Sequence, residues 1–227
     1  MNKHHDFADR DALDEALADH IARQLQADID HRGAASLAVS GGSTPKGLFA
    51  RLSALELDWR KVWITLVDER WVNSDSPDSN ERLVRENLLQ GAAAAANFIG
   101  LKGTGSNASE GLEEITARLS ALPLPFSCVV LGMGGDGHTA SWFPQASNLG
   151  ALIDPKGHEL LGSCEPVTAP HQRITFTLPP VLESGEIILH ITGEEKRAVL
   201  AEAADRHYPI AAITEQDSNP VSIWWAP

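Results

Sequence analysis

Short apolar segments alternate with amphipathic segments along the whole of this chain, and this alternation restricts the fold more than any other feature of the sequence. The clearest amphipathic segment carries an apolar residue at every fourth position from Leu13 to Leu25, which predicts a helix that begins near Asp9 or Asp11 and ends at Gly33. The apolar segments are continuous runs, as is typical of strands that are buried on both faces. Together they predict an α/β fold in which helices cover both faces of a mainly parallel sheet.

The remaining elements are expected to follow the same alternation, and no repeat or long linker separates them, so residues 1–227 are expected to form a single domain. In a sheet of this kind, ligands bind beyond the carboxyl ends of the strands, and the residues that follow each strand are therefore candidate site residues. Strands are expected at residues 36–40, 62–70, 126–134, 186–192 and 221–227. Further helices are expected at residues 45–55, 80–89, 110–122 and 193–205.

The charge of the chain limits its partners. A net charge of −13 argues against binding to nucleic acid or to acidic membranes, because either would be repelled over most of the surface. No apolar run reaches the roughly 18 residues of a membrane span, and no secretory signal is visible. The two cysteines, Cys128 and Cys164, form no CxxC motif, and we expect reduced thiols in a cytoplasmic protein. An anionic ligand would require a local cluster of cations.

The segment SGGSTP at residues 40–45 follows the first long apolar run and precedes an expected helix. Gly41 and Gly42 allow the backbone to approach a ligand, and Ser43 and Thr44 offer hydroxyl and N–H groups. A glycine turn that leads into a helix N-terminus can bind an anion. The alternative is an ordinary turn with a Ser or Thr cap, and this segment alone does not decide between the two.

The expected strand at 62–70 ends on three charged residues, Asp68, Glu69 and Arg70. A guanidinium can bind a phosphate through two parallel hydrogen bonds, which makes Arg70 a candidate phosphate ligand. Asp68 or Glu69 could orient Arg70 or contact a sugar hydroxyl. The alternative is a solvated loop that carries a structural ion pair.

Gly132, Gly134 and Gly137 have the spacing G-x-G-x-x-G at the end of another expected strand, which is the spacing of a dinucleotide-binding turn. Such a turn requires a long helix that begins at the third glycine. Pro144 and Pro155 interrupt any helix here, so we do not expect a dinucleotide site.

The same loop carries Gly135, Asp136 and His138, and its glycines allow it to pass close to a small ligand. A lone histidine is usually a structural or surface residue. A histidine in a glycine-rich loop at a strand end, two residues from an aspartate, is a better candidate for a general base.

Arg173 and Lys196 are two further cations expected at or near strand ends. Lys196 falls in the first turn of an expected helix, where the helix dipole disfavours a cation, and this suggests an anionic ligand, although an ordinary surface lysine is the alternative. No metal site is expected, because HExxH and Cys/His clusters are absent and the adjacent His4 and His5 lie in a terminal segment that we expect to be mobile. The nucleophile elbow G-x-S-x-G is absent too.

Five segments resemble those of the 6-phosphogluconolactonases in both order and spacing, and the resemblance extends from about residue 9 to the C-terminus. It implies a three-layer α/β/α fold with a Rossmann-like sheet, related to glucosamine-6-phosphate deaminases and ribose-5-phosphate isomerases. It also implies hydrolysis of 6-phospho-D-glucono-1,5-lactone in the oxidative pentose phosphate pathway, without a cofactor. The segments are SGGSTPKGLF, VDERWVNSDSPDSNERLVRENLL, LGMGGDGHTASWFP, HQRITFTLP and GEEKRAVL.

On this interpretation His138 activates a water molecule and then returns the proton to the leaving ring oxygen, with Asp136 or Asp68 orienting the imidazole. Backbone N–H groups of the glycine loop, or one of the arginines, could face the oxyanion. The remaining candidates are substrate-binding residues: the backbone of Gly41, Gly42 and Gly135, and the phosphate ligands Ser43, Thr44, Arg70, Arg173 and Lys196.

Two other functions stay open. A glucosamine-6-phosphate deaminase would share the glycine loop and the D-G-H core, but it would carry an acidic residue just before the proline, where this chain has Phe143. A non-catalytic sugar-phosphate-binding protein would keep the phosphate cations and could lose His138, so the presence of both favours an enzyme. The sequence is compatible with a monomer or a small homo-oligomer.

Overall fold

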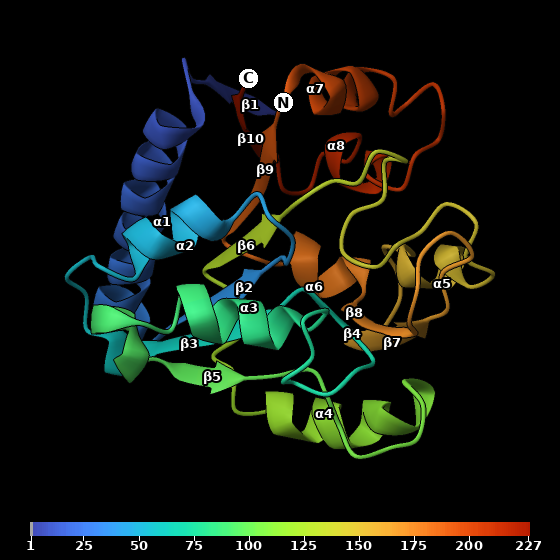
Figure 1. Cartoon of the computed structure of the whole chain (residues 1–227), viewed down its shortest axis with the longest axis horizontal. Helices are drawn as coiled ribbons and strands as arrows, with labels where there is room; N and C mark the ends of the chain where they lie inside the picture. Colours follow the sequence, from blue (N-terminus) through green and yellow to red (C-terminus); the bar gives the residue numbers. More distant parts are fainter. Residues whose placement is uncertain (1) are drawn as a thin grey trace.

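A seven-stranded sheet forms the centre of the computed structural model, which describes residues 2–227 (Figure 1). Its strand order is β1-β10-β9-β6-β2-β3-β5, and every neighbouring pair is parallel. The carboxyl ends of the strands therefore lie along one edge of the sheet. The strands are β1 (Lys3–Asp6), β2 (Ala35–Val39), β3 (Val62–Leu66), β5 (Asn97–Ile99), β6 (Cys128–Leu131), β9 (Glu186–Thr192) and β10 (Ser222–Ala226).

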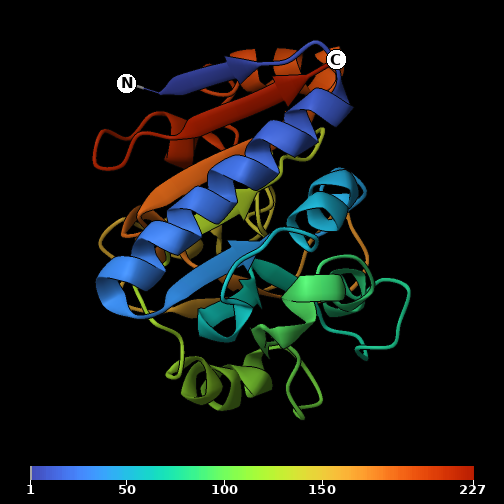
Figure 2. The same ribbon diagram turned by 90° about the vertical axis from the view of Figure 1, so that its left-hand side faces the viewer.

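Helices cover both faces of this sheet. The long helix α1 runs diagonally across one face, with α2 beside it, whereas α6 and α8 lie on the other side (Figures 1 and 2). The predicted α/β fold, a mainly parallel sheet with flanking helices, is confirmed. The α-helices are α1 (Arg10–Arg32), α2 (Lys46–Leu52), α3 (Asn80–Asn87), α4 (Leu112–Leu119), α5 (Leu149–Leu152), α6 (Leu178–Leu182), α7 (Glu194–Ala201) and α8 (Ala211–Thr214). Within residues 2–227, none of the helices combines the length and the apolar character that crossing a membrane requires.

The ends of α1 are those that the sequence predicts. The Asp9 carboxylate accepts a hydrogen bond from the Ala12 N–H and caps the first turn. Gly33 ends the helix with φ at +83°, a left-handed conformation that favours glycine. The apolar residues spaced four apart are fully buried against the sheet. The other predicted helices and the strands at 36–40 and 126–134 are present but differ by a few residues at their ends.

The prediction of a single strand at 62–70 is wrong, because the backbone changes its hydrogen-bond partner strand at Val67. The Val67 N–H still bonds to the Val39 carbonyl of β2, but the Val67 carbonyl accepts from the Phe176 N–H. From there the chain continues as β4 (Asp68–Arg70) in a second, antiparallel sheet of order β4-β8-β7, with β7 at Leu161–Cys164 and β8 at Arg173–Phe176. The segment is buried through the change of partner, so its apolar character does not reveal where it leaves the first sheet.

The expectation that the N-terminal segment is mobile is also wrong. His4 and His5 lie in β1, which pairs with β10 at the edge of the parallel sheet. The strand was missed because its residues are polar, and they are polar because an edge strand is largely exposed.

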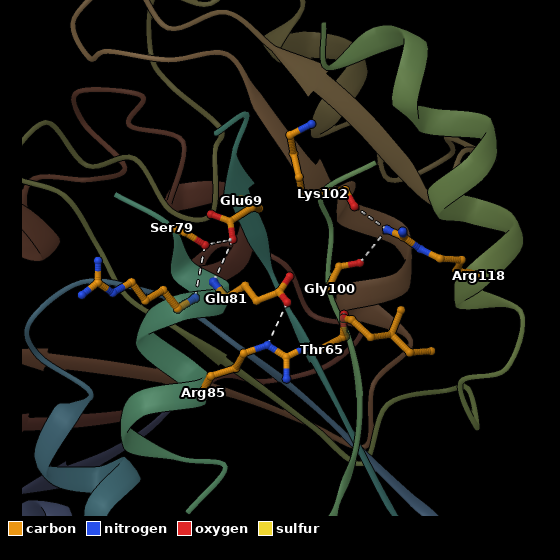
Figure 3. Close-up of polar contacts among 10 residues, drawn as sticks. Thr65, Glu69, Ser79, Glu81, Arg85, Gly100, Lys102 and Arg118 are labelled. Carbon is orange, nitrogen blue, oxygen red and sulfur yellow. Dashed lines mark hydrogen bonds and ion pairs between the residues drawn. The ribbon is translucent and has the colours of Figure 1, made fainter. Parts of the chain in front are cut away.

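Glu69 connects β4 to the loop and helix that follow it (Figure 3). Its side chain is 1% exposed and accepts hydrogen bonds from the backbone N–H groups of Arg70, Asn80 and Glu81 and from the Ser79 hydroxyl, at 2.8–3.0 Å. Burial raises the pKa of Glu69, and the four hydrogen bonds oppose that rise. Ser79 in turn caps α3 by accepting from the Arg82 N–H. One carboxylate thus holds the N-terminus of α3 against β4.

We predict that Glu69→Ala destabilises the fold by about 2–3 kcal/mol, because buried donors lose their acceptor. Glu69→Gln keeps an acceptor oxygen and should cost less. Urea unfolding measures both, with Glu86→Ala as the control, since Glu86 forms an exposed ion pair with Arg82. Equal midpoints for Glu69→Ala and the control would contradict the anchoring role.

Candidate active site

A cavity of about 510 Å³ opens at the carboxyl ends of the central strands. The loop after β2, the loop after β6, the strand pair β4–β8 and the start of α7 surround it. Most of the residues that the sequence singled out line this cavity: Gly41, Gly42, Ser43, Thr44, Asp68, Arg70, His138, Arg173 and Lys196. Gly135 and Asp136 do not line it but lie directly behind residues that do.

His138 is held by its neighbour Asp136. The Asp136 Oδ1 atom lies 2.5 Å from His138 Nδ1 and also accepts from the His138 backbone N–H at 3.2 Å. The hydrogen bond from His138 lowers the pKa of Asp136, so this side chain remains a carboxylate at neutral pH. A carboxylate at Nδ1 favours the tautomer that carries its proton there, which leaves Nε2 free to accept a proton. The imidazole also stacks on Phe143, with ring centroids 4.3 Å apart.

Asp68, the other candidate to orient His138, makes a different contact. It is 7% exposed and accepts a hydrogen bond from the Ser141 hydroxyl at 2.6 Å. No hydrogen bond joins it to the imidazole within residues 2–227. Of the two aspartates, Asp136 is therefore the partner of the His138 ring, whereas Asp68 forms part of the cavity wall.

The glycine spacing of this loop has a local explanation. A Cβ atom on Gly134 would lie 2.2 Å from the His138 ring, so only glycine leaves room for the imidazole. Gly137 has φ at +74°, and a Cβ there would lie 2.4 Å from the Tyr208 ring. The Ile210 N–H also bonds to the Gly137 carbonyl, so the 208–210 segment supports the loop from behind. The first helix after β6 is the short α5, far past Gly137, which is unlike a dinucleotide-binding turn.

Two arginines face each other across the strand pair β4–β8. Arg70 is paired in register with Arg173, and like charges in this relation repel. Arg173 is 6% exposed, and burial lowers the pKa of its guanidinium; the nearby charge of Arg70 lowers it further, while Asp68 opposes the shift. The Nε atoms of both side chains are buried and have no hydrogen-bond partner among residues 2–227. An anion bound between the two guanidiniums would relieve the repulsion and accept these hydrogen bonds.

Lys196 lies in the first turn of α7, as predicted, and adds a third cation to the cavity. A Cβ on Gly135 would lie 3.7 Å from its ammonium group, so Gly135 places the loop after β6 next to this charge. Three cations line the cavity, against the two carboxylates of Asp68 and Asp78, and they form the local cluster of cations that an anionic ligand needs in a chain of net charge −13.

Sequence reasoning missed several residues of the cavity. Asn80 bonds through its side chain to the Asp68 carbonyl, and His171 lies 3.0 Å from Asp78, joining the β7–β8 connection to the loop after β4. His190 on β9 lies in the cavity wall too. Asn80 and His171 lie within two of the segments that carry the resemblance, but no spacing marks them as site residues, and His190 lies outside those segments. Only the folded chain brings the three to the site. Glu69, a candidate to contact a sugar hydroxyl, lies outside the cavity because its oxygens bind backbone groups.

Comparisons with known proteins show which sequences and structures the chain resembles. Residues 8–224 match the family described as glucosamine-6-phosphate isomerases/6-phosphogluconolactonase. The chain is 45% identical to a 6-phosphogluconolactonase of Mesorhizobium japonicum, over 97% of this chain and 94% of that protein. It is 46% identical to the crystal structure of a 6-phosphogluconolactonase from Shewanella baltica, with a TM-score of 0.97 and coverage of 100% and 98%. A monomeric glucosamine-6-phosphate deaminase shares the fold, with a TM-score of 0.79 at 16% identity and coverage of 99% and 97%.

The close fit of Gly134 under the imidazole generates a prediction. Gly134→Ala should push the His138 ring away from Asp136, because the new methyl group would overlap the ring. Gly132→Ala is the matched control, since a Cβ there meets only the Ser40 Cβ at 4.0 Å. Crystal structures of the two variants, or the ¹⁵N chemical shifts of the imidazole, report the displacement. An undisturbed His138–Asp136 hydrogen bond in Gly134→Ala would contradict the prediction.

Proposed function

The chain belongs to the glucosamine-6-phosphate isomerase/6-phosphogluconolactonase family, and we propose that it hydrolyses 6-phospho-D-glucono-1,5-lactone to 6-phospho-D-gluconate with His138 as the general base. The observation that carries the proposal is the His138–Asp136 pair beside a cavity that also holds three cations. A base next to a phosphate-binding pocket fits a phosphorylated ester that is cleaved by water.

The reaction requires an activated water, a stabilised oxyanion and a proton for the leaving ring oxygen. Nε2 of His138 removes a proton from water as the hydroxide oxygen bonds to the lactone carbonyl carbon. The tetrahedral intermediate then collapses, the bond to the ring oxygen breaks, and the imidazolium returns the proton to that oxygen. Asp136 holds the ring in one tautomer and stabilises the imidazolium. This sequence of steps conserves protons and needs no cofactor.

The phosphate binds at a distance from the reacting carbon, to Arg70, Arg173 and Lys196 and to the Ser43 and Thr44 groups at the start of α2. Its binding energy positions the lactone carbonyl at His138. The backbone of Gly41 and Gly42 in the cavity wall allows close approach of the substrate. Gly135 holds the loop after β6 beside Lys196, and backbone N–H groups of that loop, or one of the arginines, stabilise the oxyanion. Asp68 acts from the cavity wall, where its carboxylate fixes Ser141.

We also infer the pathway, the compartment and the oligomeric state in which the protein works. The protein works in the oxidative pentose phosphate pathway of the cytoplasm, as one domain over residues 1–227, as a monomer or a small homo-oligomer. Its partner is the sugar-phosphate lactone, without nucleic acid or membrane, and the net charge of −13 supports that restriction.

Phe143 disfavours the deaminase alternative. Its ring stacks on the His138 imidazole, at the position where the resemblance puts an acidic residue in deaminases. The base therefore stands beside an aromatic ring instead of the carboxylate that ring opening would use.

We predict that His138→Asn lowers the rate of lactone hydrolysis by about 10²–10⁴-fold and changes substrate binding much less. The wild-type rate should fall on acidification, because protonation removes the base while Asp136, with its lowered pKa, stays ionised. That dependence should vanish in His138→Asn. Decay of fresh lactone over a range of pH measures both effects.

His158→Asn is the control for that experiment, since His158 is exposed and lies outside the cavity. Near-normal turnover in His138→Asn with good substrate binding would remove His138 from the mechanism and leave the function to another base.

We predict further that Arg70→Ala weakens use of the phosphorylated lactone by about 10–100-fold in kcat/KM, the effect of losing one charge-assisted hydrogen bond. The unphosphorylated glucono-1,5-lactone should be affected much less. Arg60→Ala, which removes an exposed arginine that pairs with Asp58, is the control. Equal losses on the two lactones would mean that Arg70 is not a phosphate ligand.

A further inference from the structure

His190 is a buried histidine that the mechanism above does not use. It lies on β9, is 2% exposed and contributes to the wall of the cavity. Neither ring nitrogen has a hydrogen-bond partner among residues 2–227. Buried polar atoms in folded proteins nearly always have a partner, so two unpartnered nitrogens beside a cavity point to a ligand.

Asp14 on α1 lies next to this histidine. Its Oδ1 atom is 3.4 Å from His190 Nε2, slightly longer than a good hydrogen bond, and it too has no hydrogen-bond partner among the described residues. Asp14 is 8% exposed and stands on the face of α1 that is otherwise apolar, between Leu13 and Leu17. An apolar residue would be expected at such a position unless the carboxylate had a function there.

The fold makes room for this carboxylate. A Cβ atom on Gly47 of α2 would lie 2.0 Å from Asp14 Oδ2, so α2 can approach α1 here only through a glycine. The pair is also close to the loop of the proposed base, because Leu131 of β6 is in register with Leu189 of β9. His190 therefore stands beside Gly132, the first residue of the loop that carries His138.

We propose that Nδ1 of His190 accepts a hydrogen bond from a hydroxyl group of the bound sugar, while Asp14 accepts from Nε2 of the same ring and fixes the imidazole. This inference rests on the proposed function. A neutral hydroxyl suits the position better than the phosphate does, because the Asp14 carboxylate would repel a phosphate. The cations of the cavity lie on β4, β8 and α7, whereas His190 and Asp14 lie on β9 and α1.

The experiment compares two ligands of the intact protein by calorimetry, the product 6-phospho-D-gluconate and inorganic phosphate. His190→Phe should weaken product binding by about 3- to 15-fold and leave phosphate binding unchanged, since only the product carries the hydroxyls. His190→Gln keeps an acceptor for the sugar hydroxyl and should restore part of the loss. Asp14→Asn should weaken product binding without affecting phosphate.

His20→Phe is the matched control, because His20 is also paired with a carboxylate, Glu186, but lies outside the cavity. In wild-type protein with ¹⁵N-labelled histidine, the His190 ring signals should shift on addition of the product and not of phosphate. This measurement does not depend on any variant folding.

Two results would overturn the assignment. Product binding by His190→Phe that equals the control, with no ring shift in the wild type, would leave His190 without a ligand. Equal weakening of product and phosphate would make it a phosphate ligand instead. A wild-type protein that neither hydrolyses the lactone nor binds the product would refute the proposed function itself, whereas either of the first two results would leave that function intact.

Discussion

The change of hydrogen-bond partner at Val67 determines where the rest of the cavity lies. The Val67 N–H bonds to the parallel sheet and the Val67 carbonyl to the antiparallel sheet, so a single residue joins the two sheets. Because β4 continues from this point, Asp68 and Arg70 reach the edge at which β2, β6 and β9 end. The pairing of β4 with β8 then brings Arg173 opposite Arg70, although the two arginines are far apart in the sequence.

The pairing of β4 with β8 places two positive charges side by side at a partly buried position. Two paired guanidiniums, one of them buried, repel each other in the absence of an anion, and burial lowers the pKa of Arg173. In a chain of net charge −13, this cluster of cations would draw a phosphate to the cavity. His138 is positioned by direct contacts and not by long-range charge. Gly134 leaves room for its imidazole, and Asp136 accepts a hydrogen bond from its Nδ1.

Two of the buried carboxylates, Glu69 and Asp14, differ in how fully they are hydrogen-bonded. Glu69 receives hydrogen bonds from three backbone N–H groups and a hydroxyl, and it stabilises the loop between β4 and α3. Asp14 has an oxygen without a hydrogen-bond partner, beside a histidine that also has none among residues 2–227. A buried carboxylate whose oxygens accept hydrogen bonds from the protein needs no further partner, whereas an unbonded polar group beside a cavity is available to a ligand.

The sequence by itself determined the α/β class, the limits of α1 and the position of the glycine loop at a strand end, because these follow from local periodicity, caps and proline placement. It could not separate Asp68, Glu69 and Arg70, which are consecutive yet contact Ser141, a helix N-terminus and the cavity respectively. The second sheet, the edge strand β1 and the pairing of His190 with Asp14 also depended on the tertiary structure. The physical reason is that strand partners and buried polar contacts join residues that are distant in the chain, and no local pattern encodes which of them meet.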